Sequence, residues 1–409
     1  MQRTAEVEHL TEHGCAVLCL DCPQGMLFGI DYTAWAVGPR FLGIKLIPPG
    51  LHCIYCSASA EEVGVARSSI FLYMKSKEVA VFRWDPETEM LERLANADEE
   101  ARLMDGVRNF DFDSGLGPYS NELTNDWVEL TRCISARLVS KIEPVSRTIR
   151  SQCAEYDAPI VDSQQARDEQ TIACFGDSED GDHVDAGPGA AEGTQQAQQR
   201  PQQQPLQAHM ESNAGGGALF FSQVPRSRKK LGSTPAETTQ FHMDRSAQLE
   251  EMIAREYGGD EIGILGELQL AYIAFLLGQN YDGFEQWRAL LQLLCCCERT
   301  AAQRPGLYAE LCRVFFAQLN QAPSDLFDSD LTKDNFMGAS ALSLIEVCDT
   351  ETAPPKLRKR CDKLRELVQK KFGITTEDLA LLGEDAPVVV ESDGGDLIRF
   401  DDTRLVGLD

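Results

Sequence analysis

Two Cys-x-x-Cys pairs near the N-terminus are the residues that most directly suggest a metal-binding site. Cys19 and Cys22 form the first pair, Cys53 and Cys56 form the second, and together they could offer four thiolates to zinc. Both pairs straddle the ends of predicted strands, where residues three apart point to opposite faces of a sheet. We therefore interpret these cysteines as small buried hydrophobic side chains, and we predict neither a metal site nor a cofactor.

The triplet Asp113-Ser114-Gly115 matches the catalytic triplet of aspartic proteases, in which two carboxylates share a proton. A single-chain enzyme of this kind needs a second triplet, which the sequence lacks, although a homodimer could supply one. The triplet also leads toward a predicted helix and not into a strand-rich lobe. We interpret it as a turn in which Asp113 and Ser114 bond the local backbone, and an aspartic-protease-like enzyme using Asp113 is the alternative function.

Other arrangements that support catalysis or calcium binding fail on geometry or spacing. His52 and Cys53 are adjacent in a predicted strand and face opposite sides, so they cannot form a nucleophilic dyad. The acidic run 177–182 has its glycine one place early for a calcium loop, and Pro188 stands where the closing glutamate belongs. No GxGxxG, P-loop or GxSxG motif occurs. None of these arrangements therefore supports a catalytic or calcium-binding site.

The overall negative charge argues against binding to polyanionic partners. The 409 residues include 38 Lys and Arg against 65 Asp and Glu, which gives a formal net charge of −27. Such an excess of carboxylates repels nucleic-acid phosphates and anionic membranes. No apolar run reaches the roughly 18 residues of a membrane span, and we expect the 14 cysteines to be mostly reduced thiols in the cytosol or nucleus.

The first 150 residues read as a β-rich domain with covering helices. Between residues 16 and 94, short β-branched or aromatic runs alternate with turns such as Pro48-Pro49-Gly50, which predicts a small antiparallel sandwich or barrel. Two helical stretches follow. The second carries one apolar stripe that should cover the sheet and end before Pro144. That stripe consists of Leu123, Trp127, Leu130, Ile134 and Leu138.

Residues 151–217 read as a disordered, acidic, Gln-rich linker. Residues 151–215 contain 12 Asp or Glu against Arg167 and Arg200, a net charge of −10, and few aromatic residues. Such a segment cannot bury enough apolar area to offset the entropy of ordering its chain.

Residues 218–384 are predicted to form an all-α domain. Thr234-Pro235-Ala236-Glu237 has the residue types of a helix start with a capping box. Helical periodicity then continues through about six or seven helices. The strongest amphipathic face comprises Tyr281, Phe284, Trp287, Leu290, Leu291 and Leu294. The fold class is therefore α+β with two domains, and an array of antiparallel helices is typical of interaction modules.

Residues 385–409 are predicted to be an acidic docking tail. The β-prone run Pro387-Val388-Val389-Val390 has no neighbouring strand of its own, so it favours docking on the sheet edge of another protein.

Two basic clusters interrupt the acidic background. Arg226 to Lys230 and Lys356 to Lys371 could each be a nuclear-import signal or a local patch for RNA or an acidic partner. The second also fits an ordinary helix, with Leu357, Cys361 and Leu364 on its buried side. We expect no direct RNA binding.

A long motif early in the chain gives the sequence its most specific resemblance. It spans residues 29–50, from Gly29 to Gly50, and reads GIDYTAWAVGPRFLGIKLIPPG. Further segments carry the same resemblance, and they are Leu116-Gly117-Pro118-Tyr119 with Trp127, Thr234-Pro235-Ala236-Glu237, Leu265-Gly266-Glu267-Leu268-Gln269, Phe275-Leu276-Leu277-Gly278, Phe284-Glu285-Gln286-Trp287, Asp334-Asn335-Phe336 and Ala386-Pro387-Val388-Val389-Val390-Glu391. In these segments the chain resembles the AAR-two splicing-factor family, across both predicted domains and the tail.

The resemblance implies a non-enzymatic, chaperone-like assembly factor of the U-five small nuclear ribonucleoprotein (snRNP) and of the tri-snRNP in mRNA splicing. Relatives bind the spliceosomal scaffold protein Prp-eight at its RNase H-like and Jab/MPN-like domains. While bound, they keep the spliceosomal DExH helicase from docking. The family fold is a β-rich N-terminal domain, a VHS-like helical domain and a C-terminal tail. The protein would shuttle between cytoplasm and nucleus with the snRNP precursor.

The resemblance also implies roles for individual residues. It assigns partner binding by strand addition to Pro387, Val388, Val389 and Val390. The early motif is expected to determine the fold, with Trp35 buried and Pro48-Pro49-Gly50 as a rigid turn. Its structural residues are Gly29, Asp31, Tyr32, Trp35, Gly38, Pro39, Pro48, Pro49 and Gly50. A generic cytosolic helical adaptor is the remaining alternative.

Overall fold

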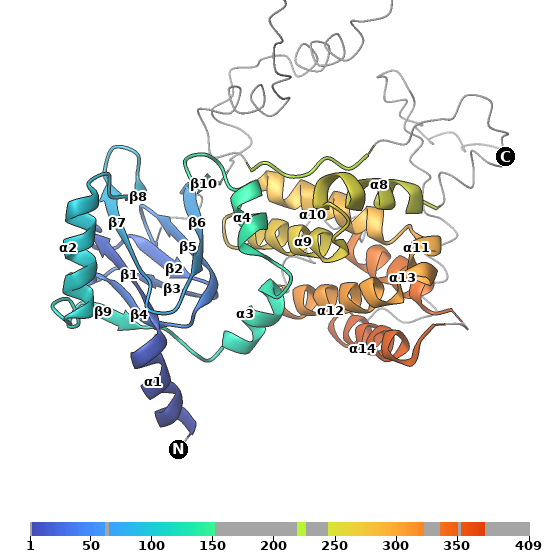
Figure 1. Ribbon diagram of the computed structural model, residues 1–409, viewed down its shortest axis with the longest axis horizontal. Coiled ribbons are helices and arrows are strands. Elements are labelled where there is room, and N and C mark those ends of the chain that lie inside the picture. The colour runs from blue at the N-terminus through green and yellow to red at the C-terminus, as the bar shows by residue number, and fades with distance from the viewer. Residues whose placement is uncertain are drawn as a thin grey trace, which may run out of the picture.

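The computed structural model describes residues 2–61, 65–151, 219–225, 244–322, 336–350 and 353–372 (Figure 1). A β-rich domain lies beside a helical domain, so the predicted α+β class with two domains is confirmed. The predicted linker beyond residue 151, the helix start at Thr234 and the docking tail fall outside the described residues. No helix within the described ranges is both long and apolar enough to cross a membrane.

Two five-stranded sheets make up the N-terminal domain, after an opening helix α1 (Gln2–His13). The first sheet has the order β8 (Met90–Arg93), β7 (Val79–Asp85), β1 (Cys15–Leu20), β4 (Gly43–Ile47) and β9 (Leu116–Pro118). The second has the order β10 (Ile149–Arg150), β6 (Arg67–Met74), β5 (Gly50–Ser57), β2 (Leu27–Ile30) and β3 (Thr33–Ala36). Alternating residues of both sheets, including Val17, Phe82, Phe28 and Ile54, enclose one core between them.

The first sheet differs from the antiparallel arrangement expected from sequence. β1 pairs with β7 in parallel, and β4 pairs with β9 in parallel, whereas the second sheet is antiparallel throughout. Turn signals in a sequence report only hairpins between successive strands. Between β1 and β7 the chain forms β2 to β6, which belong to both sheets, so this parallel pair has no local signal.

The apolar stripe from Leu123 to Leu138 forms two helices, so the prediction of one continuous stripe was wrong. α3 (Thr124–Thr131) ends before Cys133, and α4 (Ala136–Ile142) begins after Ser135, whose side chain accepts a hydrogen bond from the Leu138 amide at 3.2 Å. Serine is a preferred helix-capping residue, so it starts a new helix there. Leu123 is exposed. The earlier helix, α2 (Ala97–Arg108), packs on β7 at the outer face of the first sheet.

The helical domain contains seven helices among the described residues. They are α8 (Ser246–Tyr257), α9 (Glu261–Leu276), α10 (Tyr281–Leu294), α11 (Glu298–Gln303), α12 (Pro305–Gln321), α13 (Phe336–Cys348) and α14 (Pro355–Phe372). The predicted amphipathic face of α10 is confirmed from Trp287 onward, since Trp287, Leu290, Leu291 and Leu294 are buried, whereas Tyr281 at its start is exposed. α9 lies at the centre and is buried on almost every side from Ile264 to Ala274.

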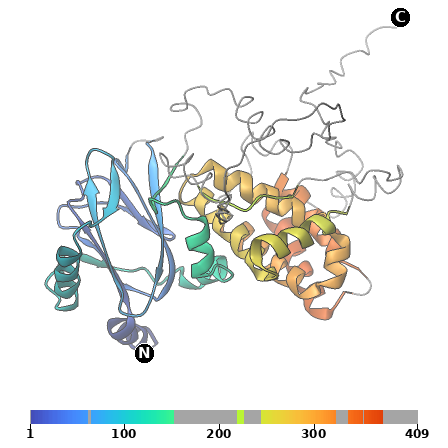
Figure 2. The ribbon, with the colours of Figure 1, turned by 45° about the horizontal axis from the view of Figure 1, so that its top comes forward.

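The two domains share a hydrophobic core. Leu51, Cys53 and Tyr55 of the second sheet belong to the same buried cluster as Trp127 of α3 and the centre of α9. Figures 1 and 2 show α3 and α4, in green, between the sheets and the helical domain. One face of the second sheet therefore covers the sandwich core, and the other is covered by helices.

Candidate functional site

The predicted docking residues, Pro387, Val388, Val389 and Val390, lie outside the described residues, and their role stays a prediction. The structure does describe the early family motif and the junction between the two domains. Both are built around buried polar side chains, whose burial is costly unless every hydrogen-bonding group has a partner.

Asp31 is the buried polar centre of the early motif. It follows β2 with a positive φ of 52° and is 2% exposed. Its Oδ1 accepts the Cys53 amide at 2.8 Å, and its Oδ2 accepts the Tyr119 hydroxyl and binds His52 Nδ1, both at 2.7 Å. One carboxylate therefore joins the β2–β3 turn to β5 and to the residue after β9.

His52 bridges two acceptors inside this cluster. Its Nδ1 faces the Asp31 carboxylate, and its Nε2 lies 2.7 Å from the Pro48 carbonyl oxygen, which can only accept. Both ring nitrogens thus donate, as in an imidazolium. Burial alone would lower the pKa of His52, but the charge and hydrogen bond of Asp31, with the Pro48 carbonyl, raise it above its ordinary value.

Tyr119 completes the cluster as a neutral donor. Burial first, and then the Asp31 charge, raise the pKa of Tyr119, so its hydroxyl keeps its proton. Its ring lies edge-on to His52, with 5.7 Å between ring centroids. The Cys53 side chain belongs to the opposite core, as expected for adjacent strand residues, so His52 has no thiol to activate. The arrangement is that of a structural hydrogen-bond network.

The remaining motif residues divide between packing and surface. A Cβ on Gly29 would lie 2.2 Å from the Tyr55 ring, so this position requires glycine. Tyr32 meets Trp127 edge-on at 5.7 Å between centroids. Trp35 lies on the edge strand β3 and is only partly buried, so the expectation of a buried Trp35 was wrong.

Several motif residues lie near turns. Gly38, Pro39 and Pro49 are exposed, and Pro48 is partly buried and supplies its carbonyl to His52. Gly50 has a φ of 144°, a backbone conformation that other residues rarely adopt.

Asp113, the residue of the protease alternative, lies in a turn before β9. Its carboxylate is half-exposed and pairs with Lys45 Nζ at 2.5 Å. In an aspartic protease, the catalytic carboxylate would instead lie against a second carboxylate, with which it shares a proton. The expected turn is present, but the Asp113 side chain pairs with Lys45, 68 residues away, where a bond to the local backbone was expected.

Three of the four Cys-x-x-Cys cysteines lie in one region, and Cys53 lies apart from them. Cys19 and Cys56 enter the core between the sheets, whereas Cys53 enters the core shared with the helical domain. Cys22 is partly buried beyond the end of β1, packs against the same core and hydrogen-bonds the Cys19 thiol. The burial of Cys19, Cys53 and Cys56 agrees with the interpretation of buried apolar side chains, and the position of Cys53 separates it from the other three.

The junction between the domains depends on two polar residues in the middle of α9. Gln269 is fully buried; its Oε1 accepts the Cys133 amide at 2.9 Å, and its Nε2 donates to the Glu129 carbonyl at 3.0 Å. It therefore holds the end of α3. The neighbouring Gly266 permits this contact, because a Cβ there would lie 2.5 Å from the Cys133 carbonyl oxygen.

Glu267 holds the described segment 219–225 against α9. Its fully buried carboxylate accepts the Ser222 amide at 2.8 Å and the Ser222 hydroxyl at 2.7 Å. Tyr257 and Gln286 each donate to it at 2.8 Å. The same segment reaches the N-terminal domain, because the Phe220 amide donates to the Ile142 carbonyl of α4 at 2.9 Å.

Further hydrogen bonds and ion pairs connect the two domains at the edges of the junction. Arg67 Nη1 donates to the Leu277 carbonyl at 2.8 Å, and Asn280 Nδ2 donates to the Arg150 carbonyl at 3.0 Å. Ion pairs join Glu129 to Arg313, Arg132 to Glu310 and Lys141 to Glu256.

These junction residues were not identified as such from the sequence, where Leu265 to Gln269 appeared only as part of the resemblance. The available signal was a glutamate and a glutamine inside an otherwise apolar helix. Such residues need buried partners, but periodicity cannot name the partners.

The second basic cluster forms α14 as expected, with Leu357, Cys361, Leu364 and Val368 buried. Three of its cations are partly buried in contacts with the fold, and the other five, from Lys356 to Lys370, are exposed. Arg360 pairs with Glu310, Arg365 with Asp349, and Lys371 donates to the carbonyls of Leu319, Asn320 and Ala322. The first cluster, Arg226 to Lys230, lies outside the described residues.

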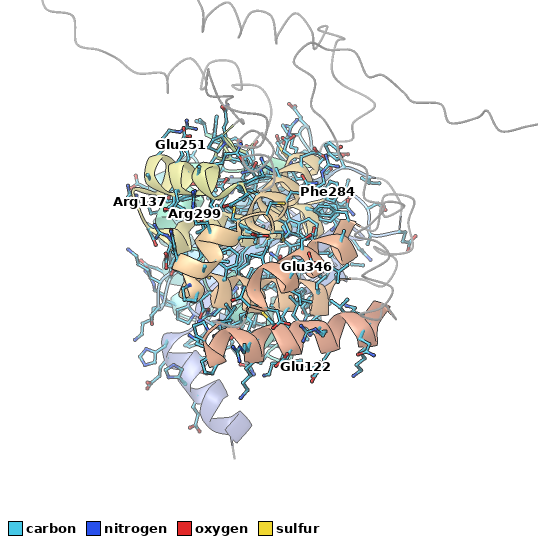
Figure 3. The ribbon with its side chains drawn as sticks, turned by 90° about the vertical axis from the view of Figure 1, so that its right-hand side faces the viewer. Glu122, Arg137, Glu251, Phe284, Arg299 and Glu346 are labelled. Atoms are coloured by element: carbon cyan, nitrogen blue, oxygen red, sulfur yellow. The ribbon has the colours of Figure 1, made fainter. Side chains whose placement is uncertain are left out.

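The surface of the helical domain mixes both signs of charge. Figure 3 labels exposed Glu251, Arg299, Glu346 and Arg137 around the face that it shows. Phe284 is partly buried, and the neighbouring Tyr281 is 48% exposed. A mixed surface of this kind suits protein contacts better than a phosphate backbone.

Comparison with known proteins assigns the family. The model described as the AAR2 N-terminal domain matches residues 13–144, and that described as the AAR2 C-terminal repeat region matches residues 221–377. The Protein AAR2 homolog of Mus musculus is 33% identical over 400 residues, covering 96% of this chain and 97% of the relative. The Homo sapiens homolog is 32% identical over 384 residues, covering 92% and 94%.

A distant animal relative extends the same result. The Protein AAR2 homolog of Caenorhabditis elegans is 30% identical over 376 residues, covering 90% of this chain and 96% of the relative. Because these matches include both domains with the buried Asp31 and Glu267 networks inside the matched regions, the chain belongs to the AAR2 family.

Proposed function

We propose that this chain is a non-enzymatic assembly factor for the spliceosomal U-five snRNP that binds the Prp-eight scaffold. The observation that carries the proposal is the match to AAR2 relatives over 90–96% of the chain. Family membership supports a splicing-related assembly factor. More specifically, we propose that the chain binds the RNase H-like and Jab/MPN-like domains of this scaffold. We also propose that it shuttles between cytoplasm and nucleus.

The junction between the domains supports a binding role. α9, α3 and the segment 219–225 are joined through fully buried Glu267 and Gln269, so the two domains present their surfaces in one arrangement. A partner with two domains of its own can then contact both at once. Binding through two linked surfaces increases affinity without any chemical step.

The tail supplies the second part of the proposed mechanism. Val388, Val389 and Val390 add a strand to the scaffold and use main-chain hydrogen bonds for direction. While the tail occupies this surface, the spliceosomal helicase cannot dock there. Mass action explains this block, because whichever protein binds the shared surface excludes the other.

The distribution of charge fits a basic, RNA-binding partner. Residues 384–409 contain eight Asp or Glu against Arg399 and Arg404, and residues 151–215 carry a net charge of −10. Complementary charge raises the rate of association and discourages wrong partners.

Main-chain pairing by the tail is tested with proline substitutions in the full-length chain. Successive N–H groups of a strand point to opposite edges, so Val388→Pro and Val389→Pro are made separately, and each removes one donor. We expect at least one to weaken capture of the purified Jab/MPN-like domain roughly tenfold. Binding is measured by calorimetry.

The matched controls are Val388→Thr and Val389→Thr, which keep the N–H and the β-branched shape, and they should bind like the original chain. Deletion after Glu384 should weaken binding further. Unchanged capture after this deletion contradicts the tail mechanism. Failure of the full chain to bind either scaffold domain contradicts the choice of partner.

A further inference from the structure

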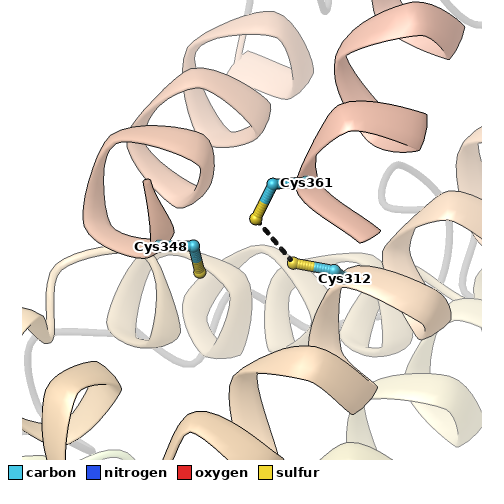
Figure 4. A group of neighbouring side chains, drawn as sticks. All are labelled: Cys312, Cys348 and Cys361. Carbon is cyan, nitrogen blue, oxygen red and sulfur yellow. Dashed lines mark hydrogen bonds between the residues drawn. The ribbon is translucent and has the colours of Figure 1, made fainter. Parts of the chain in front are cut away.

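Three buried cysteines from three helices meet in the core of the helical domain. Cys312 comes from α12, Cys348 from the end of α13 and Cys361 from α14, and each is 1% exposed. Their sulfur atoms all lie within 4.8 Å of one another, and Figure 4 shows Cys312 and Cys361 joined by a dashed line, with Cys348 beside them. The residues are distant in sequence, so no spacing motif announces them.

The separation of the sulfurs matches metal–thiolate geometry. Cys312 Sγ and Cys361 Sγ are 3.8 Å apart. Two thiolates bound to one zinc ion at about 2.3 Å, with tetrahedral angles, are separated by about 3.8 Å. A disulfide would instead bring the sulfurs to about 2.05 Å.

We propose that Cys312, Cys348 and Cys361 form a binding site for a thiophilic cation, Zn(II) or Cu(I). Soft thiolate ligands select these two ions, and the apolar surroundings exclude hard cations that prefer oxygen. Three thiolates satisfy trigonal Cu(I). Zn(II) takes a fourth donor, and the adjacent candidate is Cys295 at the end of α10.

Cys295 lies close enough to interact electrostatically with Cys312 and Cys348. It is 3% exposed, and its thiol donates to the Ser340 carbonyl at 3.3 Å. To serve as a fourth ligand, this thiol would have to give up its bond to Ser340. Zn(II) would therefore need Cys295 as a fourth ligand, whereas Cu(I) would not.

Each cysteine binds the cation as a thiolate. Cation binding replaces one proton on each thiol that still carries it, so up to three protons pass to solvent for each ion bound. Affinity should therefore fall steeply as the pH is lowered.

Occupation of this site would link α12, α13 and α14. Of these, α14 is the last helix described before the predicted docking tail. A bound cation would stabilise the folded chain by mass action and fix the helix from which that tail departs. This inference concerns the helical core and stands independently of the proposed partner.

The test uses the reduced, full-length chain after treatment with a chelator. Zn(II) and Cu(I) are titrated separately against competing chelators of known affinity, and Co(II) is added as a spectroscopic substitute for Zn(II). We expect one equivalent to bind, a Co(II)–thiolate charge-transfer band and a higher unfolding temperature. Binding of neither Zn(II) nor Cu(I) to the chain would overturn the proposal.

Alanine variants identify the ligands. Cys361→Ala and, separately, Cys348→Ala should weaken binding by at least roughly a hundredfold. Cys296→Ala, a partly buried cysteine outside the cluster, is the matched control and should bind normally. Circular dichroism and unfolding without metal separate loss of a ligand from loss of the fold. Equal affinity of the original chain and both folded cluster variants would contradict the site.

Cys295→Ala distinguishes the two cations. Selective loss of Zn(II) affinity indicates the four-thiolate site, and retained Cu(I) affinity indicates the three-thiolate site. Thiol counting on the unreduced chain is the last check. A disulfide between Cys312 and Cys361 as the native state would overturn the proposal.

Discussion

At the scale of single residues, the early motif is explained by one buried carboxylate. Asp31 accepts from Cys53, Tyr119 and His52, and these partners come from two separate segments, strand β5 and the residue after β9. The sequence predicted that Asp31 belongs to a fold-determining motif. It could not pair Asp31 with Tyr119, 88 residues away, because side-chain contacts over such distances leave no periodic signal.

This network predicts a pH dependence of stability. Because the pKa of His52 is higher in the folded chain than its ordinary value near 6.5, the folded state holds the proton more tightly. The stabilisation is complete below about pH 6.5 and is lost as the pH rises through the folded pKa. The free energy of unfolding should fall there by up to about 1.4 kcal/mol per pH unit.

Urea unfolding of the full chain between pH 5.5 and 9 measures this contribution. His52→Gln should flatten the slope, whereas His13→Gln, at the partly exposed last residue of α1, should leave it unchanged. An equal slope in the original chain and in a folded His52→Gln variant would show that His52 is neutral in the folded state.

At the scale of elements, α9 shows what periodicity can and cannot predict. The sequence indicated a helix here, and the helix is present, but it is buried on nearly every side and so has no single face to assign. Gly266, Glu267 and Gln269 are the residues that orient it against α3 and the segment 219–225.

The close approach of α9 to the N-terminal domain predicts opposite effects for two helical glycines. Gly266→Ala places a methyl group 2.5 Å from the Cys133 carbonyl oxygen and 2.8 Å from Leu138. The helix must shift, at a cost of about 1–3 kcal/mol. Gly306→Ala meets nothing within 4 Å, so it should be neutral or stabilising by up to about 1 kcal/mol.

Chemical unfolding of both variants checks this pair. The loss in Gly266→Ala should be accompanied by faster hydrogen exchange at the Cys133 amide, which Gln269 protects. If the two glycine variants have equal stability, the contact between α9 and the α3–α4 corner is not tight.

Other elements also show which structural features local sequence patterns predict and which they do not. The strands, the amphipathic face of α10 and the buried side of α14 follow from local periodicity, and they are present. The break at Ser135 depends on one capping side chain, and the parallel pairs β1–β7 and β4–β9 depend on the path of the chain between sheets. The three-cysteine cluster combines residues that only the packing of α12, α13 and α14 brings together.

At the scale of the whole molecule, composition predicted two domains joined by an acidic linker, as if each had its own core. The structure instead joins Cys53 and Tyr55 of the second sheet to Trp127 and α9 in one hydrophobic cluster. The hydrogen bond between Arg67 and Leu277 joins residues 210 positions apart. Contacts across such separations follow from tertiary packing, which local sequence patterns do not encode.

Shared packing predicts that the two domains unfold together. Trp127 is 3% exposed, donates from Nε1 to the Leu51 carbonyl at 2.7 Å and packs in the common cluster. Trp127→Ala should therefore cost about 3–5 kcal/mol. Trp127 packs against both domains, so this loss of stability should affect both. Amide hydrogen exchange in β5 and in α9 should therefore accelerate by a similar factor, roughly a hundredfold or more.

Trp35→Ala is the matched comparison, because Trp35 is partly buried on the edge strand β3 and packs only against the sandwich core. It should accelerate exchange in β2 and β3 and leave α9 almost unchanged. Hydrogen exchange followed by mass spectrometry measures both regions in one experiment. If Trp127→Ala affects β5 alone, the helical domain is stable without the sheet, and the two surfaces offered to a partner are not held in one arrangement by this core.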